Sequence, residues 1–283
     1  MQIEALKTPG VEIYGVDIAA GLGDNEFGAI QQAFVEHGLI FFRDQMLSEQ
    51  DHIDLARRFG DININRFFAA NPNYPEIALV TKESDQQENI GGGWHTDHSY
   101  DIEPALGSIL VARELPPSGG DTWFVSMYQA YENLSAGLQQ NLARLQAVHS
   151  THHVFGSAGA YDGDKQTGGR IGNAGAADAM DDVVHPVVIS HPLSGRKALY
   201  VNPGFTVRFA GWSDEESMPL LDFLYQQAVA ETQVTKFHWQ PGSIAFWDNR
   251  ATWHFAQNDY PGQRREMHRI TIEGCALTAA VAC

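Results

Sequence analysis

Short runs of strand-forming residues, separated by turns, occur along most of the chain and limit the folds that it can adopt. Few of these runs are separated by helices, so the chain lacks the regular alternation of strand and helix that builds a parallel sheet. The pattern instead predicts a mainly β sandwich or jelly roll with outer helices. The predicted strands are Val11 to Ile18, Leu39 to Phe42, Ile77 to Thr81, Ala105 to Arg113, Asp121 to Val125, Val183 to Ser190, Ala198 to Asn202, Phe205 to Phe209, Thr235 to Gln240, Ser243 to Asp248 and Arg265 to Glu273.

Helical periodicity is strongest in three segments, two early and one late in the chain. Glu26 to His37 repeats apolar residues at helical spacing, and Gly38 follows as a residue that commonly ends a helix. Ser48 to Phe59 begins with a favourable N-cap serine. Asp214 to Val229 carries three acidic residues in its first turn, where they stabilise the helix dipole. We expect these helices to lie outside the sheets.

Residues 156 to 182 form a long segment that is dense in glycine, alanine and aspartate and has little periodicity. A loop longer than ~15 residues inside a compact domain is usually either functional or disordered. We therefore predict a lid that orders over bound substrate, with a flexible surface insertion as an equally favoured alternative.

The charge of the chain restricts its partners. The formal net charge is −17, which argues against nucleic acid or an anionic membrane surface because both require a basic face. An anionic small molecule would need a few well-placed arginines to reverse this field locally. The chain has two cysteines, Cys275 and Cys283, and neither a basic leader nor an apolar stretch of ~18 residues. We therefore expect a cytoplasmic protein without a disulfide framework.

The segment Gly91 to Tyr100 contains a histidine and an aspartate separated by one residue. On a β-strand His95 and Asp97 would project from the same face. Such a pair and one distant histidine form the 2-His-1-carboxylate triad, which holds Fe(II) and leaves positions open for substrate and O₂. Because His-x-Asp strings also arise by chance, the tripeptide alone favours no metal site.

Further candidate residues lie near the C-terminus. His254 follows the predicted strand Ser243 to Asp248 and is a candidate third ligand. Arg265 and Arg269 share one face of a strand, about 13 Å apart at ~3.3 Å per residue, and two cations on one inward face need anions. Taken singly, a surface salt bridge for each arginine and a structural role for the histidine are the favoured alternatives.

Together these motifs resemble the TauD/TfdA family of Fe(II)/2-oxoglutarate-dependent dioxygenases. The resemblance spans nearly the whole chain, and the order and spacing of the motifs hold from Thr122 through Arg269. It implies a double-stranded β-helix, or jelly roll, in which residues 1–283 form a single dioxygenase domain. The matching motifs are His-Thr-Asp (95–97), Ser-Gly-Gly-Asp-Thr (118–122), Trp-Asp-Asn-Arg (247–250), His254 and Gln-Arg-Arg-x-Met-His-Arg (263–269).

The resemblance also implies roles for individual residues. His95, Asp97 and His254 match the iron ligands of the family. Thr122 and Arg265 match the pair that grips the distal carboxylate of 2-oxoglutarate, and this pairing suits the bidentate fork of arginine. Arg269 matches a position beside the keto-acid end, where it contacts an anionic group of the substrate. The implied reaction consumes 2-oxoglutarate and O₂, yields succinate and CO₂, and hydroxylates a substrate C–H bond.

The substrate is predicted from positions at which this chain differs from the taurine dioxygenases of the family. Phe205 matches a substrate-packing aromatic position of taurine dioxygenases, but Asn65 and Phe68 stand where those enzymes have a histidine and a tyrosine, and Gly91 stands where they have an asparagine. A pocket with fewer polar partners would leave the amine of a small zwitterion unsatisfied. We therefore expect a more apolar organic anion: a sulfonate, a sulfate ester or an aryloxyalkanoate. Hydroxylation next to the heteroatom would then break the C–S or C–O bond.

Two other functions stay open at this point. The same iron chemistry can end in a stable hydroxylation or a desaturation, as it does in biosynthetic members of the family. The chain could also be a jelly roll that binds a small acid without catalysis, although a complete ligand triad speaks against this. The resemblance implies a homodimer or a homotetramer.

Overall fold

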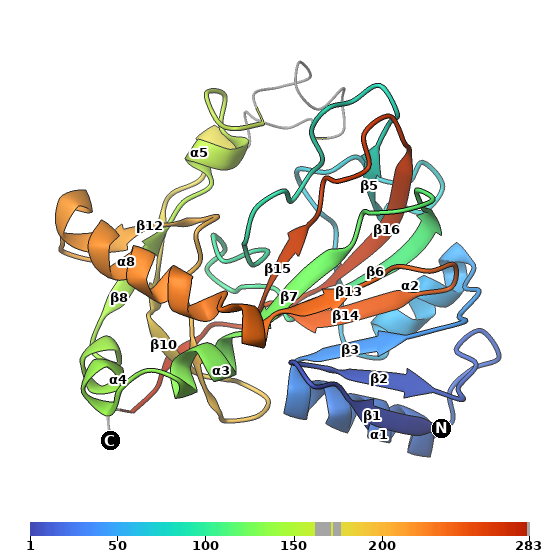
Figure 1. Cartoon of the computed structure of the whole chain (residues 1–283), viewed down its shortest axis with the longest axis horizontal. Coiled ribbons are helices and arrows are strands. Elements are labelled where there is room, and N and C mark those ends of the chain that lie inside the picture. The colour runs from blue at the N-terminus through green and yellow to red at the C-terminus, as the bar shows by residue number, and fades with distance from the viewer. Residues whose placement is uncertain (162–170, 172–176, 282–283) are drawn as a thin grey trace.

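A large, mainly antiparallel sheet forms one wall of the molecule (Figure 1). The computed structural model describes residues 1–161, 171 and 177–281. Neighbouring strands of this sheet are antiparallel except β2 and β3, which run parallel. In spatial order the strands are β1 (Gln2–Ala5), β2 (Val11–Tyr14), β3 (Leu39–Phe42), β14 (Ile244–Asp248), β6 (Gly107–Glu114), β16 (Arg265–Ile272) and β4 (Ile62–Asn63), and β5 (Ala78–Lys82) also pairs with β16.

A second sheet, β13 (Thr235–Phe237), β7 (Thr122–Ser126) and β15 (Thr252–Ala256), contributes to an apolar core together with the first. Alternate residues of each strand point into this core. Phe41 of β3 stacks on Phe237 of β13 with ring centroids 4.1 Å apart, and Phe124 of β7 contacts Trp247 of β14 at 5.6 Å. This arrangement is a jelly roll, so the predicted mainly β fold is confirmed.

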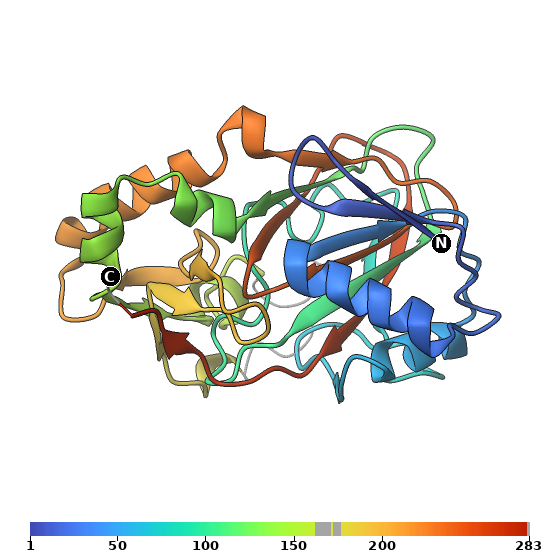
Figure 2. The ribbon, with the colours of Figure 1, turned by 90° about the horizontal axis from the view of Figure 1, so that it is seen from below.

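Two helices, α1 (Asp24–His37) and α2 (Glu49–Arg57), pack on the large sheet, on the side away from the smaller sheet (Figure 2). Phe34 of α1 stacks on Phe246 of β14 at 4.0 Å between ring centroids. Gly38 ends α1 with a φ of 67°, a left-handed conformation that glycine adopts without strain. The predicted outer helices early in the chain are therefore confirmed to within a few residues.

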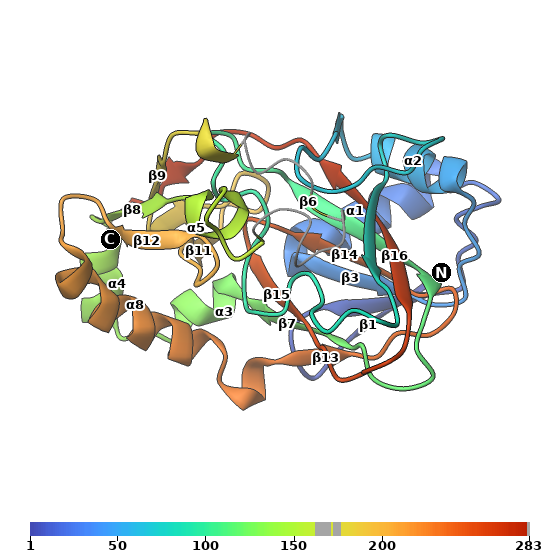
Figure 3. The same cartoon turned by 90° about the horizontal axis from the view of Figure 1, so that it is seen from above.

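The remaining elements form a separate group beside the jelly roll (Figure 3). The prediction of one strand from Val183 to Ser190 is wrong, because two strands of different sheets replace it. Between them, Val187 donates its N–H to the Leu145 carbonyl and accepts from the Tyr200 N–H. One sheet of this group consists of β12 (Thr206–Phe209), β8 (Gln146–His149) and β9 (Val183–Pro186), and a second consists of β11 (Lys197–Leu199), β10 (Val188–Ser190) and β17 (Thr278–Ala279). The helices of the group are α3 (Met127–Glu132), α4 (Ala136–Leu142), α5 (His152–Phe155), α8 (Asp214–Ala228) and the 3-10 helix η1 (Glu231–Gln233).

The predicted lid, residues 156–182, falls largely on residues 162–170 and 172–176, which lie outside the described residues. Its described N-terminal end, residues 156–161, follows α5 directly. Within the described ranges, no helix has both the length and the apolar character needed to cross a membrane.

A buried charge network fixes the turn between β14 and β15. The carboxylate of Asp248 accepts from Nε and Nη2 of Arg250 at 2.9 and 2.7 Å, and Nε2 of His191 lies 3.0 Å from it. Burial alone would raise the pKa of Asp248, but Arg250 and His191 lower it below its ordinary value. The network holds the chain just before His254, a candidate ligand.

Replacing Arg250 by Leu should lower the free energy of unfolding by about 3 to 5 kcal/mol, because it leaves the buried Asp248 carboxylate without its main counter-charge. Urea unfolding at neutral pH measures this loss. Arg57→Leu is the matched control, since Arg57 makes its ion pair with Glu76 while more than half exposed, and it should cost at most about 1 kcal/mol. Equal losses in the two variants would contradict the role given to the network.

Candidate active site

Three side chains from distant parts of the chain meet at the edge of the jelly roll: His95, Asp97 and His254. One ligand atom of each lies within 4.8 Å of the others, and no other such group of metal-binding side chains occurs among the described residues. Nε2 of His95 lies 3.7 Å from Oδ1 of Asp97, and Nε2 of His254 lies 3.9 Å from its Oδ2. Two imidazoles and one carboxylate at this spacing suit a divalent transition metal with open positions.

The structure corrects the backbone predicted around these residues. His95 to Asp97 is a loop rather than a strand, and it joins the fold through a single bridge to β15. In this bridge the N–H of His254 donates to the His95 carbonyl at 2.9 Å, and the His95 N–H donates to the His254 carbonyl at 3.1 Å. His254 lies in the middle of β15 rather than just beyond a strand. The bridge therefore sets the two imidazoles side by side, with ring centroids 4.1 Å apart.

Neighbouring groups orient two of the three candidate ligands, His95 and Asp97. Nδ1 of His95 lies 2.8 Å from the carbonyl of Gly93, so a proton there donates to this carbonyl and leaves Nε2 free to bind a metal. Oδ2 of Asp97 accepts from Nη1 of Arg269 at 3.0 Å and from the hydroxyl of Ser108 at 3.3 Å. Its Oδ1 faces His95 instead. The protein thus holds the carboxylate through Oδ2, and each of its two oxygens lies within 4 Å of one of the two imidazoles.

The charges of the site favour metal binding. Burial is the largest effect on His254 and lowers its pKa well below the ordinary value, and nearby His95 lowers it further. Burial would raise the pKa of Asp97, but Arg269 and the surrounding histidines lower it below its ordinary value. A neutral imidazole and an ionised carboxylate are the forms that coordinate metals.

A second cluster of polar side chains surrounds Arg265, which lies on the same face of β16 as Arg269. Nη2 of Arg265 is 3.5 Å from the hydroxyl oxygen of Thr122, which accepts the indole N–H of Trp239 at 2.9 Å. Arg265 is buried, its Nε has no partner among the described residues, and burial lowers its pKa. Because the Thr122 oxygen already accepts, its O–H can donate to a ligand. A guanidinium and a hydroxyl that lack an anion here suit a carboxylate.

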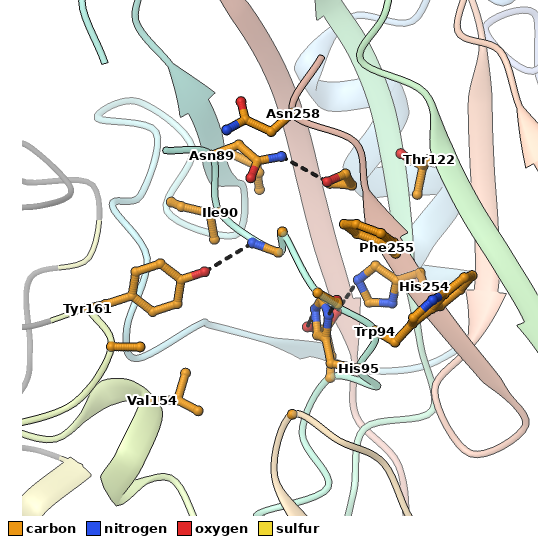
Figure 4. Close-up of a pocket in the computed structure, with 18 of the residues that line it drawn as sticks. Asn89, Ile90, Trp94, His95, Thr122, Val154, Tyr161, His254, Phe255 and Asn258 are labelled. Atoms are coloured by element: carbon orange, nitrogen blue, oxygen red, sulfur yellow. Dashed lines mark hydrogen bonds and ion pairs between the residues drawn. The ribbon is translucent and has the colours of Figure 1, made fainter. Parts of the chain in front are cut away.

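A cavity of about 870 Å³ joins the two clusters (Figure 4). His95 and His254 point toward each other on one side of it, while Tyr161 and Val154 line the opposite side. Phe68, Phe205, Thr122, Arg265 and Arg269 also line it. The structure therefore brings all but one of the predicted site residues to a single cavity.

Asn65 is the residue that does not line this cavity. Its side-chain oxygen accepts the backbone N–H groups of Phe67 and Phe68, each at 2.9 Å. Asn65 thus shapes the turn that presents Phe68, whose ring lies 4.4 Å from the Arg269 guanidinium carbon. An asparagine that caps its own turn is a recognisable local signal, but only the structure distinguishes that role from contact with a ligand.

Reasoning from the sequence did not identify several residues of the site, among them Trp239 and Ser108, which support the predicted residues. Trp239 supports Thr122, and Ser108 of β6 supports Asp97. Ser108 lies on β6, whereas Trp239 lies two residues beyond the end of β13 although the predicted strand included it, and both residues are buried. No local motif marks them, because their partners are distant in the sequence.

Comparison with known proteins agrees with these features. The model of the taurine catabolism dioxygenase TauD, TfdA family matches residues 2–271. An alkylsulfatase of Acinetobacter baylyi is 31% identical over 96% of this chain and 84% of its own length. An alpha-ketoglutarate-dependent sulfate ester dioxygenase of Pseudomonas putida is 32% identical, with 94% and 86% covered. An (S)-phenoxypropionate/alpha-ketoglutarate-dioxygenase of Sphingobium herbicidovorans is 31% identical, with 94% and 92% covered.

Solved structures give the same result. A taurine dioxygenase from Burkholderia xenovorans matches with a TM-score of 0.82 at 29% identity, over 100% of this chain and 92% of that one. A second structure, AAD-2 in complex with Mn(II) and N-oxalylglycine, matches with a TM-score of 0.79 at 25% identity, over 98% and 100%. With a family model matched along most of its length, the chain belongs to the TauD/TfdA family of Fe(II)/2-oxoglutarate-dependent dioxygenases.

Proposed function

We propose that this dioxygenase hydroxylates a small organic anion, a sulfonate, a sulfate ester or an aryloxyalkanoate, on the carbon that bears the heteroatom. The overall reaction turns substrate, 2-oxoglutarate and O₂ into hydroxylated substrate, succinate and CO₂. The hydroxylated carbon then expels the heteroatom group, which breaks the C–S or C–O bond and leaves a carbonyl compound. The observation that carries the proposal is the convergence of His95, Asp97 and His254 on a cavity that also contains Arg265 and Arg269.

In this proposal Fe(II) is held by Nε2 of His95, Oδ1 of Asp97 and Nε2 of His254. Bound iron would couple the oxidative decarboxylation of 2-oxoglutarate to hydroxylation of the substrate. The protein's part is to keep the ligands in the right form and orientation. Gly93 fixes the tautomer of His95, and Arg269 with Ser108 restrains the second oxygen of Asp97.

We assign the distal carboxylate of 2-oxoglutarate to Arg265 and Thr122. The unpartnered Nε of Arg265 and the free O–H of Thr122 support this assignment, because a carboxylate can accept from both. Trp239 orients Thr122 from behind. Neutralising a buried guanidinium also relieves the desolvation that lowers its pKa, so part of the binding free energy originates here.

Arg269 is the cation that we assign to the anionic group of the substrate. Its Nε is buried without a partner among the described residues, while its Nη1 remains paired with Asp97. Phe68 stacks on the guanidinium, and Phe205 contacts His95 with ring centroids 6.4 Å apart. These aromatic neighbours support an anion with an apolar body and exclude water from the reacting carbon.

We further propose that residues 1–283 act as one catalytic domain in the cytoplasm, as a homodimer or homotetramer. The two cysteines fit a reducing compartment, and the family match covers both sheets of the jelly roll. The −17 net charge supports the absence of nucleic acid among the partners.

Replacing His254 by Ala should abolish the charge-transfer absorption that appears when Fe(II) and 2-oxoglutarate are added under anaerobic conditions, because the metal loses one of three protein ligands. Anaerobic absorption spectroscopy measures the band. His37→Ala is the control, since His37 lies at the end of α1, and this variant should keep the band. A full band in the His254 variant would refute the ligand assignment.

Replacing Arg265 by Leu should leave the ligand-free protein at least as stable as the wild type, because it removes an uncompensated buried charge. With Mn(II) present, 2-oxoglutarate at 100 times its Kd should stabilise the wild type by about 2.7 kcal/mol and the variant far less. Urea unfolding with and without 2-oxoglutarate measures both effects. Arg264→Leu is the adjacent control and should respond to 2-oxoglutarate normally, because Arg264 pairs with Glu83, Glu114 and Glu266.

With a cleaved sulfonate as substrate, the wild type should release sulfite and succinate in equal amounts. Taurine should react with a kcat/KM at least about 10-fold lower, because burying its amine without partners costs more than about 1.4 kcal/mol. Sulfite and succinate assays separate the outcomes. Succinate with a stable hydroxylated or desaturated product would indicate a biosynthetic oxygenase, and no succinate with any anion would indicate a binding protein.

A further inference from the structure

We propose that the substrate carries an aromatic ring, held in the part of the cavity bounded by Phe68, Val154 and Phe155. This inference rests on the proposed function, because it concerns the substrate of the same site. The proposed function names the anionic group of the substrate. The inference adds the chemical nature of the other group, which is attached to the reacting carbon.

The first observation is the size of the cavity. Its volume of about 870 Å³ lies toward the upper end of the roughly 300 to 1,000 Å³ that accommodate drug-sized ligands. A five-carbon keto acid and a two-carbon sulfonate are both much smaller than such ligands. The cavity therefore has room for a substrate with a substantial body beyond its anionic group.

The second observation is the chemistry of the cavity wall that includes Tyr100, Phe155, Tyr161 and Phe205. Aromatic rings there form one connected cluster: Phe155 stacks on Phe67 at 4.4 Å and lies 5.9 Å from Tyr161, at interplanar angles of 15° and 20°. Tyr100 meets Phe205 edge to face at 4.7 Å. A wall of rings in both orientations offers faces and edges to another ring, and such contacts favour an aromatic group over an aliphatic group of equal size.

The third observation is that several polar groups that line the cavity already have partners within the protein. Nδ2 of Asn89 donates to the Ala256 carbonyl at 2.9 Å, and Nδ2 of Asn258 donates to the Gln87 carbonyl at 2.9 Å. The hydroxyl of Tyr161 accepts the Gly91 N–H at 3.2 Å (Figure 4). A polar tail would have to displace these bonds, whereas an aromatic ring needs no hydrogen bond.

The positions of the two arginines determine the orientation of the bound substrate in the cavity. Arg265 lies with Thr122, at the site assigned to the co-substrate, and Arg269 lies against Asp97 beside the metal ligands. The anionic group of the substrate therefore sits near Arg269, next to the reacting carbon. The ring points the other way, toward Val154 and Phe155.

Matched pairs of compounds test the inference: 2-phenylethanesulfonate against 2-cyclohexylethanesulfonate, 2-phenylethyl sulfate against 2-cyclohexylethyl sulfate, and phenoxyacetate against cyclohexyloxyacetate. Each pair keeps the anion and the size of the tail and changes only its aromaticity. The measurements are kcat/KM from succinate release and the apparent Kd from the change in the anaerobic charge-transfer band. We expect the wild type to favour the aromatic member by about 2- to 12-fold for each ring contact that it makes.

Two variants locate the effect. Phe155→Leu keeps an apolar wall but removes a ring, and it should reduce the preference for the aromatic member toward 1. Ala160→Trp fills the cavity from an exposed lining position, so it should weaken the phenyl compounds at least 10-fold and leave ethanesulfonate unchanged. Phe223→Leu is the control, because Phe223 is exposed on α8 outside the cavity, and it should keep the wild-type preference.

The outcomes separate this inference from the proposed function. If the aromatic and cyclohexyl members react and bind alike, the proposed function stands and the aromatic site is wrong. If no pair perturbs the band or releases succinate, the proposed substrate class is wrong and the aromatic site falls with it. If Phe155→Leu does not fold, unchanged activity of Ala160→Trp with the phenyl compounds still overturns the inference.

Discussion

The ion pair between Asp97 and Arg269 is the interaction on which the site depends. A carboxylate buried at this depth is stable only beside compensating charge, and Arg269 on β16 provides it at 3.0 Å. The same contact occupies one oxygen of Asp97 and leaves the other facing His95. The requirement to neutralise one buried charge therefore also ties the loop that carries His95 and Asp97 to the large sheet.

In the proposed function, the two arginines of β16 bind two different anions in one cavity. They stand two inward positions apart, with Met267 between them, so their side chains enter the same interior at different depths. Arg265 is bordered by Thr122 and Trp239, and Arg269 by Asp97 and Phe68. The net charge of the whole chain is −17, which disfavours the approach of an anion. The two arginines reverse this effect locally, so anion binding is favourable at Arg265 and Arg269.

Segments outside the jelly roll provide the apolar side of the cavity. Val154 and Phe155 come from α5, and Phe205 precedes β12, so the second group of sheets and helices shapes the pocket without contributing a metal ligand. The division is physically reasonable, because a rigid sheet holds ligand geometry while connecting segments can differ without disturbing it. The candidate metal ligands and much of the apolar wall thus come from different parts of the chain.

The sequence alone determined the features that depend on local pattern. Alternation placed Arg265 and Arg269 on one face of a strand, helical spacing marked α1, α2 and α8, and the His-x-Asp motif identified two ligands. Only the tertiary structure showed that His254 lies close enough to His95 and Asp97 to complete the triad, that the motif is a loop bridged to β15, and that Asn65 caps a turn instead of lining the cavity. The role of Asn65 is local, but the sequence does not show whether its side chain faces the turn or the cavity. The other two outcomes depend on pairing between segments more than a hundred residues apart, and periodicity along one segment carries no information about which distant partner it meets.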